Sequence, residues 1–432
     1  ENLIIKVYKA GNLEPVYVMD GCDAVNDRHL TLEVDGRKHR YEFSYDGETN
    51  DDGAYYVTIE YRDRAGNEMV GNEQFTCENG LFISDTFLLD HTAPIFDVIY
   101  ETDAVNVIQD GILQDKKRPL QDSTAYYNCD IKVKFRIEES YVHKKEDVWE
   151  HLEFELWEVT KDGKRLVSDE EPMLSEINEE KSKYEAGFTI AADVTNHETD
   201  GNYQFVIRYH DCAGNVMTGG NLELQEILKG GMYQSPILVL DTTAPEIVTR
   251  YMSEIPKCDN ERKYFSIHTI FQINVSDRNI RCGDLTKELK NIQTKDRYGN
   301  PVKTTIVEDL KSQYDENEIL QALGKDSAEM SVNIALTVDA NYEIPVDFID
   351  LAGNRAVVIQ RETDHIYREG YVEKVTIDTT IPKLQLTYSY EDPANYMEEG
   401  YLFAKKAMSV TARRSSRRIY INFRGGKRDD SK

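Results

Sequence analysis

What this sequence has little of excludes several classes of protein. No apolar run approaches the roughly 18 residues that a membrane-spanning helix needs, so no transmembrane segment is predicted. Lys and Arg number 51 against 79 Asp and Glu, a net charge of −28. Because phosphate binding needs clustered basic side chains, this balance argues against nucleic acid as the partner of the main body.

Cysteine is also scarce, with six residues in the whole chain and no CxxC pair. The missing pairs argue against a zinc–thiolate site. Unpaired thiols are the favoured interpretation, and an isolated bridge between Cys258 and Cys282 stays open.

Tyrosine is abundant, with 27 residues against 2 Trp, and tyrosine suits the half-buried pleated surface of a β-sheet. A length of 432 residues corresponds to roughly three domains of ordinary size. The composition therefore favours a globular, strand-rich chain of several domains.

A repeated phrase organises the sequence. Asp-x-Ala-Gly-Asn occurs at 63–67, 211–215 and 350–354, and an Asp-x-Thr-x-Pro linker follows each copy, at 90–94, 241–245 and 378–382. Three copies in the same order predict a tandem array in which each repeat is one folding unit.

An aromatic strand precedes each phrase. In the second copy Tyr203, Phe205, Ile207 and Tyr209 alternate with other residues, which predicts a strand with one buried face. The glycine of the phrase can adopt positive φ, so the strand should turn back as a hairpin. The returning strand is expected at 237–240 in the second copy and at 372–377 in the third.

Earlier strands end in an acidic residue. Apolar residues alternate over 131–137 and over 271–275, and Glu139 and Asp277 follow them. About seven short strands per repeat predict an all-β fold of β-sandwiches with loop or short-helix insertions, the helices being expected within 175–183 and 315–324.

The expected domains are a partial repeat at 1–91 that lacks its first strands, repeats at 92–242 and 243–379, and the start of a further repeat at 380–432. We expect the natural protein to be longer at both ends. Residues 404–432 hold ten Lys or Arg against two Asp, which indicates either a disordered end or a basic arm for anionic polymers or membrane headgroups.

The aromatic strand, the Asp-x-Ala-Gly-Asn hairpin and the Asp-Thr-Thr-Ala-Pro linker resemble the bacterial immunoglobulin-like repeats of surface proteins from Gram-positive and gut-dwelling bacteria. The resemblance covers about residues 1–412. It implies tandem immunoglobulin-like sandwiches in a secreted protein held at the bacterial cell surface. Its motifs identify the type of repeat and not the binding partner.

In such a sandwich the incoming linker, the loop after the second strand and the last hairpin lie at one end. Oxygen ligands from several loops suit Ca²⁺, and a bound ion would stiffen the joint. The alternative is that each Asp only accepts hydrogen bonds from its own turn. The candidate ligands are Asp90, Glu139, Asp211 and Asn215 for the repeat at 92–242, and Asp241, Asp277, Asp350 and Asn354 for the repeat at 243–379.

Neither catalysis nor another cofactor finds support, since none of the nine His residues lies in an HExxH motif and no GxSxG motif occurs. The leading hypothesis is a non-enzymatic stalk or adhesin segment at the cell surface. A second is direct binding of a host protein, such as mucin or an immunoglobulin, or of a glycan, which the insertion at 168–183 favours. A third is an accessory region of a larger secreted hydrolase.

Overall fold

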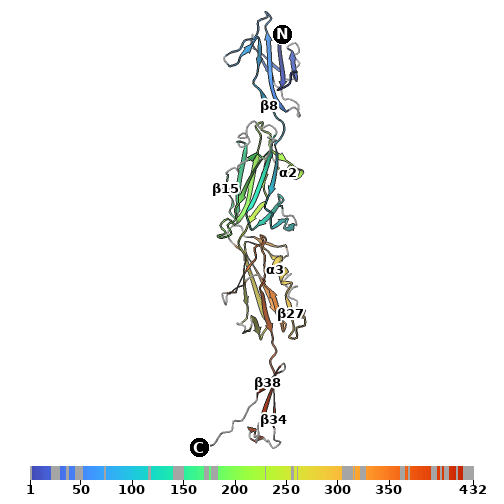
Figure 1. The fold of residues 1–432 in the computed structure, drawn as a ribbon, viewed down its shortest axis with the longest axis vertical. Coiled ribbons are helices and arrows are strands. Elements are labelled where there is room, and N and C mark those ends of the chain that lie inside the picture. The colour runs from blue at the N-terminus through green and yellow to red at the C-terminus, as the bar shows by residue number, and fades with distance from the viewer. Residues whose placement is uncertain are drawn as a thin grey trace.

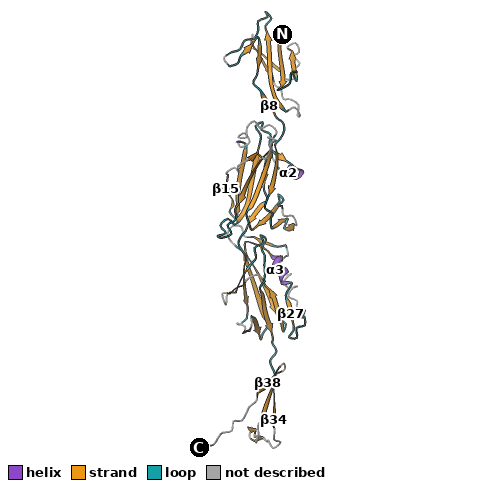
Figure 2. Cartoon of the chain, viewed as in Figure 1, coloured by secondary structure: helices purple, strands orange, loops and turns teal. Residues whose placement is uncertain are grey.

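The computed structural model shows an all-β chain whose first and last described strands lie toward opposite ends of a long axis (Figure 1). Strands dominate, and the two labelled helices are short (Figure 2). None of the helices in the described part of the chain is long and apolar enough to cross a membrane. The structure describes residues 2–20, 30–35, 38–43, 52–72, 74–114, 118–139, 150–169, 175–176, 183–228, 230–253, 257–259, 261–303, 315, 317–321, 327–360, 365–367, 370–390, 397–398, 401–402, 408–414 and 417–421.

Unit 1, which comprises β1–β8, is built on one six-stranded sheet with the order β2-β1-β5-β7-β6, and β8 also pairs with β5. Leu3, Ile5 and Met19 form its buried cluster. β3 and β4 pair only with each other. The bounds are β1 Asn2–Lys9, β2 Tyr17–Asp20, β3 Leu30–Asp35, β4 Lys38–Phe43, β5 Gly53–Arg62, β6 Cys77–Glu78, β7 Leu81–Ile83 and β8 Phe87–Leu89.

Unit 2, which comprises β9–β21, packs two sheets around a core that includes Phe96, Phe135 and Phe205. One sheet has the order β11-β10-β12-β21-β18-β14-β15, with β20 on β18, and the other β16-β17-β13-β9-β19. The bounds are β9 Ile95–Tyr100, β10 Asn106–Gln109, β11 Ile112–Gln114, β12 Ser123–Tyr127, β13 Ile131–Glu138, β14 Leu152–Thr160, β15 Gly163–Ser168, β16 Ser175–Glu176, β17 Lys183–Ile190, β18 Gly201–Tyr209, β19 Thr218–Gly219, α2 Leu222–Ile227, β20 Met232–Gln234 and β21 Ile237–Leu240.

Unit 3, which comprises β22–β33, repeats this arrangement with sheets β29-β25-β22-β31-β32 and β23-β24-β33-β30-β27. Its core includes Phe271, Tyr342 and Phe348. The bounds are β22 Glu246–Tyr251, β23 Lys257–Asp259, β24 Arg262–Phe265, β25 Thr269–Asp277, β26 Asn279–Arg281, α3 Cys282–Leu289, β27 Gln293–Lys295, β28 Ile319–Gln321, β29 Ala328–Leu336, β30 Ala340–Pro345, β31 Val357–Gln360, β32 His365–Tyr367 and β33 Val372–Ile377.

The first strand of unit 1 has the same kind of partner as a strand of unit 2. β1 pairs antiparallel with β5 just as β14 pairs with β18, so 2–9 corresponds to β14 of unit 2. At the other end, β34 Leu384–Tyr390, β37 Met408–Arg414 and β38 Arg417–Ile421 form a three-stranded sheet beside the small pair β35 Met397–Glu398 and β36 Tyr401–Leu402. The interpretation of the basic tail as disordered is therefore wrong for 408–414 and 417–421, and 422–432 lies outside the described residues.

Three other predictions are corrected by the structure. β18 is buried on both faces, because Gln204 and Val206 are buried as well as the aromatic residues between them. The helices expected within 175–183 and 315–324 are wrong where those segments are described, since 175–176 and 319–321 are strands. Cys282 is a free thiol buried in the core of unit 3, so it forms no bridge to Cys258.

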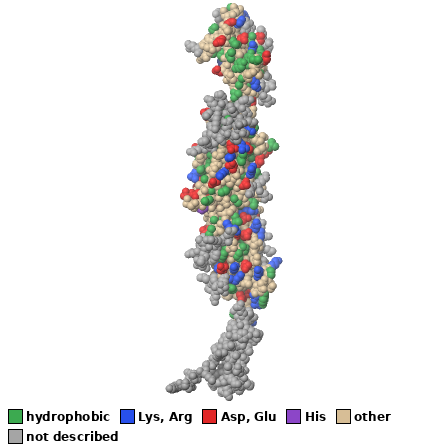
Figure 3. Space-filling model, viewed as in Figure 1, with side chains coloured by type: hydrophobic (Ala, Val, Ile, Leu, Met, Phe, Trp, Pro, Cys, Tyr) green, Lys and Arg blue, Asp and Glu red, His purple; other side chains and the backbone are tan. Residues whose placement is uncertain are grey.

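Acidic and basic side chains are intermixed on the described surface of the face in Figure 3. Apolar side chains are also exposed on unit 1 in this view (Figure 3). The acidic residues that the sequence singles out lie where one unit meets the next.

Candidate functional site

Each linker is fixed to the unit before it by an aspartate that directly precedes the aromatic strand. Asp200 accepts hydrogen bonds from the Thr242 amide at 3.0 Å and from the hydroxyls of Thr242 and Thr243 at 2.8 and 2.7 Å. Asp52 plays the same part for the linker at 90–94, and Asp339 for the linker at 378–382. Sequence reasoning missed these three residues, although an Asp stands before the aromatic strand in every copy.

The linker is fixed to the unit after it by the asparagine of Asp-x-Ala-Gly-Asn. Asn215 Nδ2 donates to the Asp90 carbonyl at 2.9 Å, and Asn354 Nδ2 donates to the Asp241 carbonyl at 2.8 Å. The same nitrogens also donate to the carboxylates of Asp211 and Asp350, each at 2.8 Å. Both predicted asparagines therefore act through the amide nitrogen and hold hairpin and linker together.

The hairpin closes without help from a neighbouring unit. In unit 1, Asp63 accepts bonds from the Asn67 amide at 2.8 Å and from Asn67 Nδ2 at 2.7 Å, both within the turn. Asp296 and Asn300 form the same turn elsewhere on the surface of unit 3. The aspartates therefore close their own turns, as expected. At the two junctions the asparagine of the turn also donates a bond to the linker.

A third acid reaches each joint from the end of β13 in unit 2 and of β25 in unit 3. Glu138 pairs with Ile95 and Ser276 pairs with Glu246, and these partners directly follow the prolines of the two linkers. Glu139 and Asp277 come one position later, so the sheet register brings them beside the linker. This convergence is what the strand order predicts from sequence.

The structure brings the six predicted carboxylates together in two groups of three. Within each group, one oxygen from every carboxylate lies within 4.8 Å of the others. The first junction, defined by the linker at 90–94, holds Asp90, Glu139 and Asp211, and the second, defined by the linker at 241–245, holds Asp241, Asp277 and Asp350. Whether either group binds a cation stays a prediction.

Burial shapes the electrostatics of the second junction. All three of its carboxylates are buried, whereas Asp90 at the first junction is half-buried. Burial, followed by repulsion from neighbouring carboxylates, raises the pKa of Asp277 to about 7 and that of Asp350 to about 8. Burial also raises the pKa of Asp241 and of Asp90.

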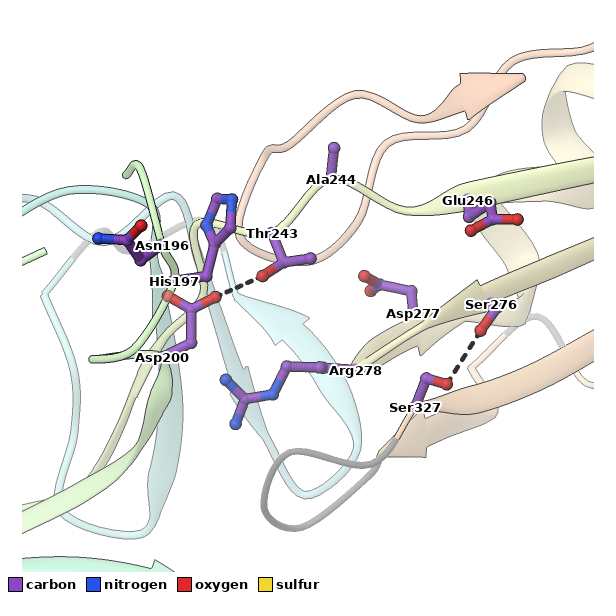
Figure 4. Close-up of a pocket in the computed structure, with 10 residues that line it drawn as sticks. All are labelled: Asn196, His197, Asp200, Thr243, Ala244, Glu246, Ser276, Asp277, Arg278 and Ser327. Carbon is purple, nitrogen blue, oxygen red and sulfur yellow. Dashed lines mark hydrogen bonds between the residues drawn. The ribbon is translucent and has the colours of Figure 1, made fainter. Parts of the chain in front are cut away.

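Arg278 is the cationic side chain that follows Asp277, and it lines a pocket between units 2 and 3. Its charge lowers the pKa of Asp241 and Asp277, although burial outweighs this effect in both. Figure 4 shows Arg278 extended toward Asp200, while the carboxylate of Asp277 turns to the other side, toward the Thr243–Ala244 linker. Among the described residues no ion pair within 4.0 Å joins Arg278 to the three carboxylates.

Neither a scan against protein-family models nor a search of the curated proteins finds a match to this chain. The function proposed below is therefore argued from the sequence and from the geometry of the two junctions.

Proposed function

We propose that this chain is a non-enzymatic stalk or adhesin segment of a bacterial surface protein, located outside the cell. The resemblance to surface-protein repeats supports the location. The arrangement of the units end to end supports the role of a spacer (Figure 1).

The observation that carries the proposal is the two-sided attachment of each linker. At the second junction Asp200 holds the linker from unit 2, and Asn354 holds it from unit 3. Thr218 and Val357 add backbone bonds to Pro94 and Pro245, each at 2.8 Å. A flexible tether would leave its backbone groups to water, whereas these linkers are bonded along their length, as a spacer that must keep its reach requires.

The alternative is that the repeats themselves bind a host protein or a glycan, and the insertion at 168–183 is the feature of the sequence that favours it. Most of that insertion lies outside the described residues, which include only 168–169, 175–176 and 183 of it. The structure therefore adds nothing to this alternative, and the spacer role is the better supported of the two.

Small-angle scattering of the chain tests the proposal. We expect a pair-distance distribution with a long tail, typical of units in a row, and no saturable binding to mucin, immunoglobulin or a glycan panel. A compact distribution, with the units folded back on one another, would contradict the spacer role. Saturable binding that is lost on deleting 168–183 would favour the host-binding alternative.

A further inference from the structure

The second junction holds three buried carboxylates and one buried cation, Arg278, which acts on Asp241 and Asp277 without an ion pair to either. No Lys, Arg or His nitrogen among the described residues lies within 4.0 Å of Asp241, Asp277 or Asp350. Several like charges buried together are costly unless protons or a cation neutralise them. One arginine does not balance three carboxylates, so the group needs further positive charge whenever all its members are ionised.

A second observation, separate from the acidity of the group, indicates where that partner lies. Asp277 is only 4% exposed, and its Oδ1 has no hydrogen-bond partner, while its Oδ2 accepts from the Asn279 amide at 2.9 Å. A buried acceptor without a partner is costly, so such an atom is a position at which a bound ion can supply the partner.

Asn279 repeats this pattern beside the same group. It is 1% exposed, its Nδ2 donates to Asp241 Oδ2 at 2.6 Å, and its Oδ1 has no hydrogen-bond partner. Rotation of the amide by half a turn would place Oδ1 on the Asp241 side. Two buried oxygens thus have unused lone pairs, one on Asp277 within the group and one on Asn279 beside it.

Because all these donors are oxygens, the group suits a hard cation. Ca²⁺ takes ligands at about 2.3–2.6 Å, which allows oxygens on opposite sides of the ion to lie up to about 5 Å apart. The separation of at most 4.8 Å between the three carboxylate oxygens falls within this range. Mg²⁺ takes its ligands at about 2.0–2.1 Å in strict octahedral geometry. Carboxylate oxygens that lie close to 4.8 Å apart would therefore have to move closer together to bind it.

We propose that the second junction binds one Ca²⁺ ion through Asp241, Asp277 and Asp350, with Asn279 Oδ1 and water completing the coordination. Asp241 ends unit 2 and the other ligands belong to unit 3, so the ion joins the two units. The proposal goes beyond the spacer role and does not depend on it.

The first junction does not carry the same proposal. Its group contains the half-buried Asp90, and position 141, which would correspond to Asn279, lies outside the described residues.

Calorimetric titration of CaCl₂ into the chelator-treated chain at pH 8 tests the proposal. We expect saturable heat and a rise in melting temperature that EGTA reverses. Asp277→Asn, which keeps the side-chain shape, should abolish one bound ion or weaken it at least tenfold. The matched control is Asp296→Asn, which alters the same kind of aspartate turn away from any carboxylate group and should bind as the unaltered chain does.

Terbium luminescence gives a readout that does not require a variant in the site. Tyr126 is buried close enough to Asp241 for that charge to raise the pKa of its hydroxyl, so it should sensitise Tb³⁺ bound at the junction. Emission should be displaced by Ca²⁺ and reduced in Tyr126→Phe, which retains the ring. Absence of calcium heat together with absence of displaceable emission would overturn the proposal, as would unchanged binding in a folded Asp277→Asn chain.

Discussion

The two junctions share their hydrogen bonds and differ in their packing. At the second junction the hairpin residues Leu351 and Ala352 are buried in a cluster with Ile108, Tyr126 and Val239 of unit 2. Asn106 Nδ2 adds a bond of 2.7 Å to the Leu351 carbonyl. At the first junction the corresponding residues Cys212 and Ala213 are exposed.

The difference has two causes that can be read from the chain. One is the variable residue of Asp-x-Ala-Gly-Asn, which is Leu at the second junction and Cys at the first. The other is the surface that the hairpin of the next unit packs against. In unit 2 that surface includes β10 and β12. In unit 1 the strand before the linker is β8, which pairs only with β5 among the described strands. Attachment of the linker is thus common to both joints, and apolar stiffening is specific to one.

Leu351→Ala should produce the largest effect. Leu351 is 1% exposed, and truncation of a buried leucine costs about 2–4 kcal/mol of the free energy of unfolding. Cys212→Ala at the first junction is the matched control and should change stability by less than about 0.5 kcal/mol. Denaturant unfolding of both variants measures the difference, and equal effects would contradict the packed second joint.

Substitution of the hairpin glycines sharpens the same comparison. Gly214 and Gly353 have φ of +89° and +92°, so alanine at either position should cost about 1–2 kcal/mol. A Cβ on Gly353 would also come within 2.9 Å of Val105 Cγ1 in unit 2, whereas one on Gly214 would meet nothing within 4 Å. Gly353→Ala should therefore lower the melting temperature further, and an equal shift would show that Val105 yields without cost.

Much of the candidate site follows from sequence because it depends on topology. In each unit, one strand leads into an acid, Glu139 or Asp277, and a hairpin follows later, at 211–215 or 350–354. Once strand and hairpin are assigned to the same sandwich, its connectivity brings their acids to the incoming linker. That step needs only the strand order, so the wrong helix assignments elsewhere do not affect it.

What sequence could not supply depends on contacts between units. The aspartates that hold the linker threonines belong to the preceding unit, and Asp200 is separated from Thr242 by 42 positions. The burial of Leu351 likewise depends on β10, whose residues 106–109 carry no motif. The second buried face of β18 arises in part because Ser235 bonds to Gln204 and Phe205, which a pattern of alternating residues does not reveal.

A pH titration in the presence of EGTA tests the electrostatics of the second junction. Between pH 4 and 8 the folded chain should hold protons on Asp277 and Asp350 that the unfolded chain has lost, because their folded pKa values are about 7 and about 8 and the ordinary value is 3.8. Unfolding then releases protons, so stability should fall as pH rises from 5 to 8.5, by on the order of 1 kcal/mol or more.

The control for that titration is Asp277→Asn, which removes one of the repelling charges and should flatten the dependence. Carboxyl groups with lowered pKa, such as Glu185, lose their protons at lower pH and contribute little in this window. Stability that is constant or increases between pH 5 and 8.5 would contradict the buried, mutually repelling group.

The hairpin asparagines that bond to the linkers should have the smallest effect on the free energy of unfolding. Their effect on the spread of distances between neighbouring units should be the clearest. Asn215→Ala and Asn354→Ala each remove a half-buried bond to the linker carbonyl, at a cost of about 1 kcal/mol. Asn215→Ala should also broaden the distance distribution between spin labels on units 1 and 2, because no hairpin packing holds the first joint. Asn354→Ala should leave the distribution between units 2 and 3 narrow, since Leu351 stays buried. If both distributions broaden equally, hydrogen bonding and not apolar packing sets the stiffness of the second joint.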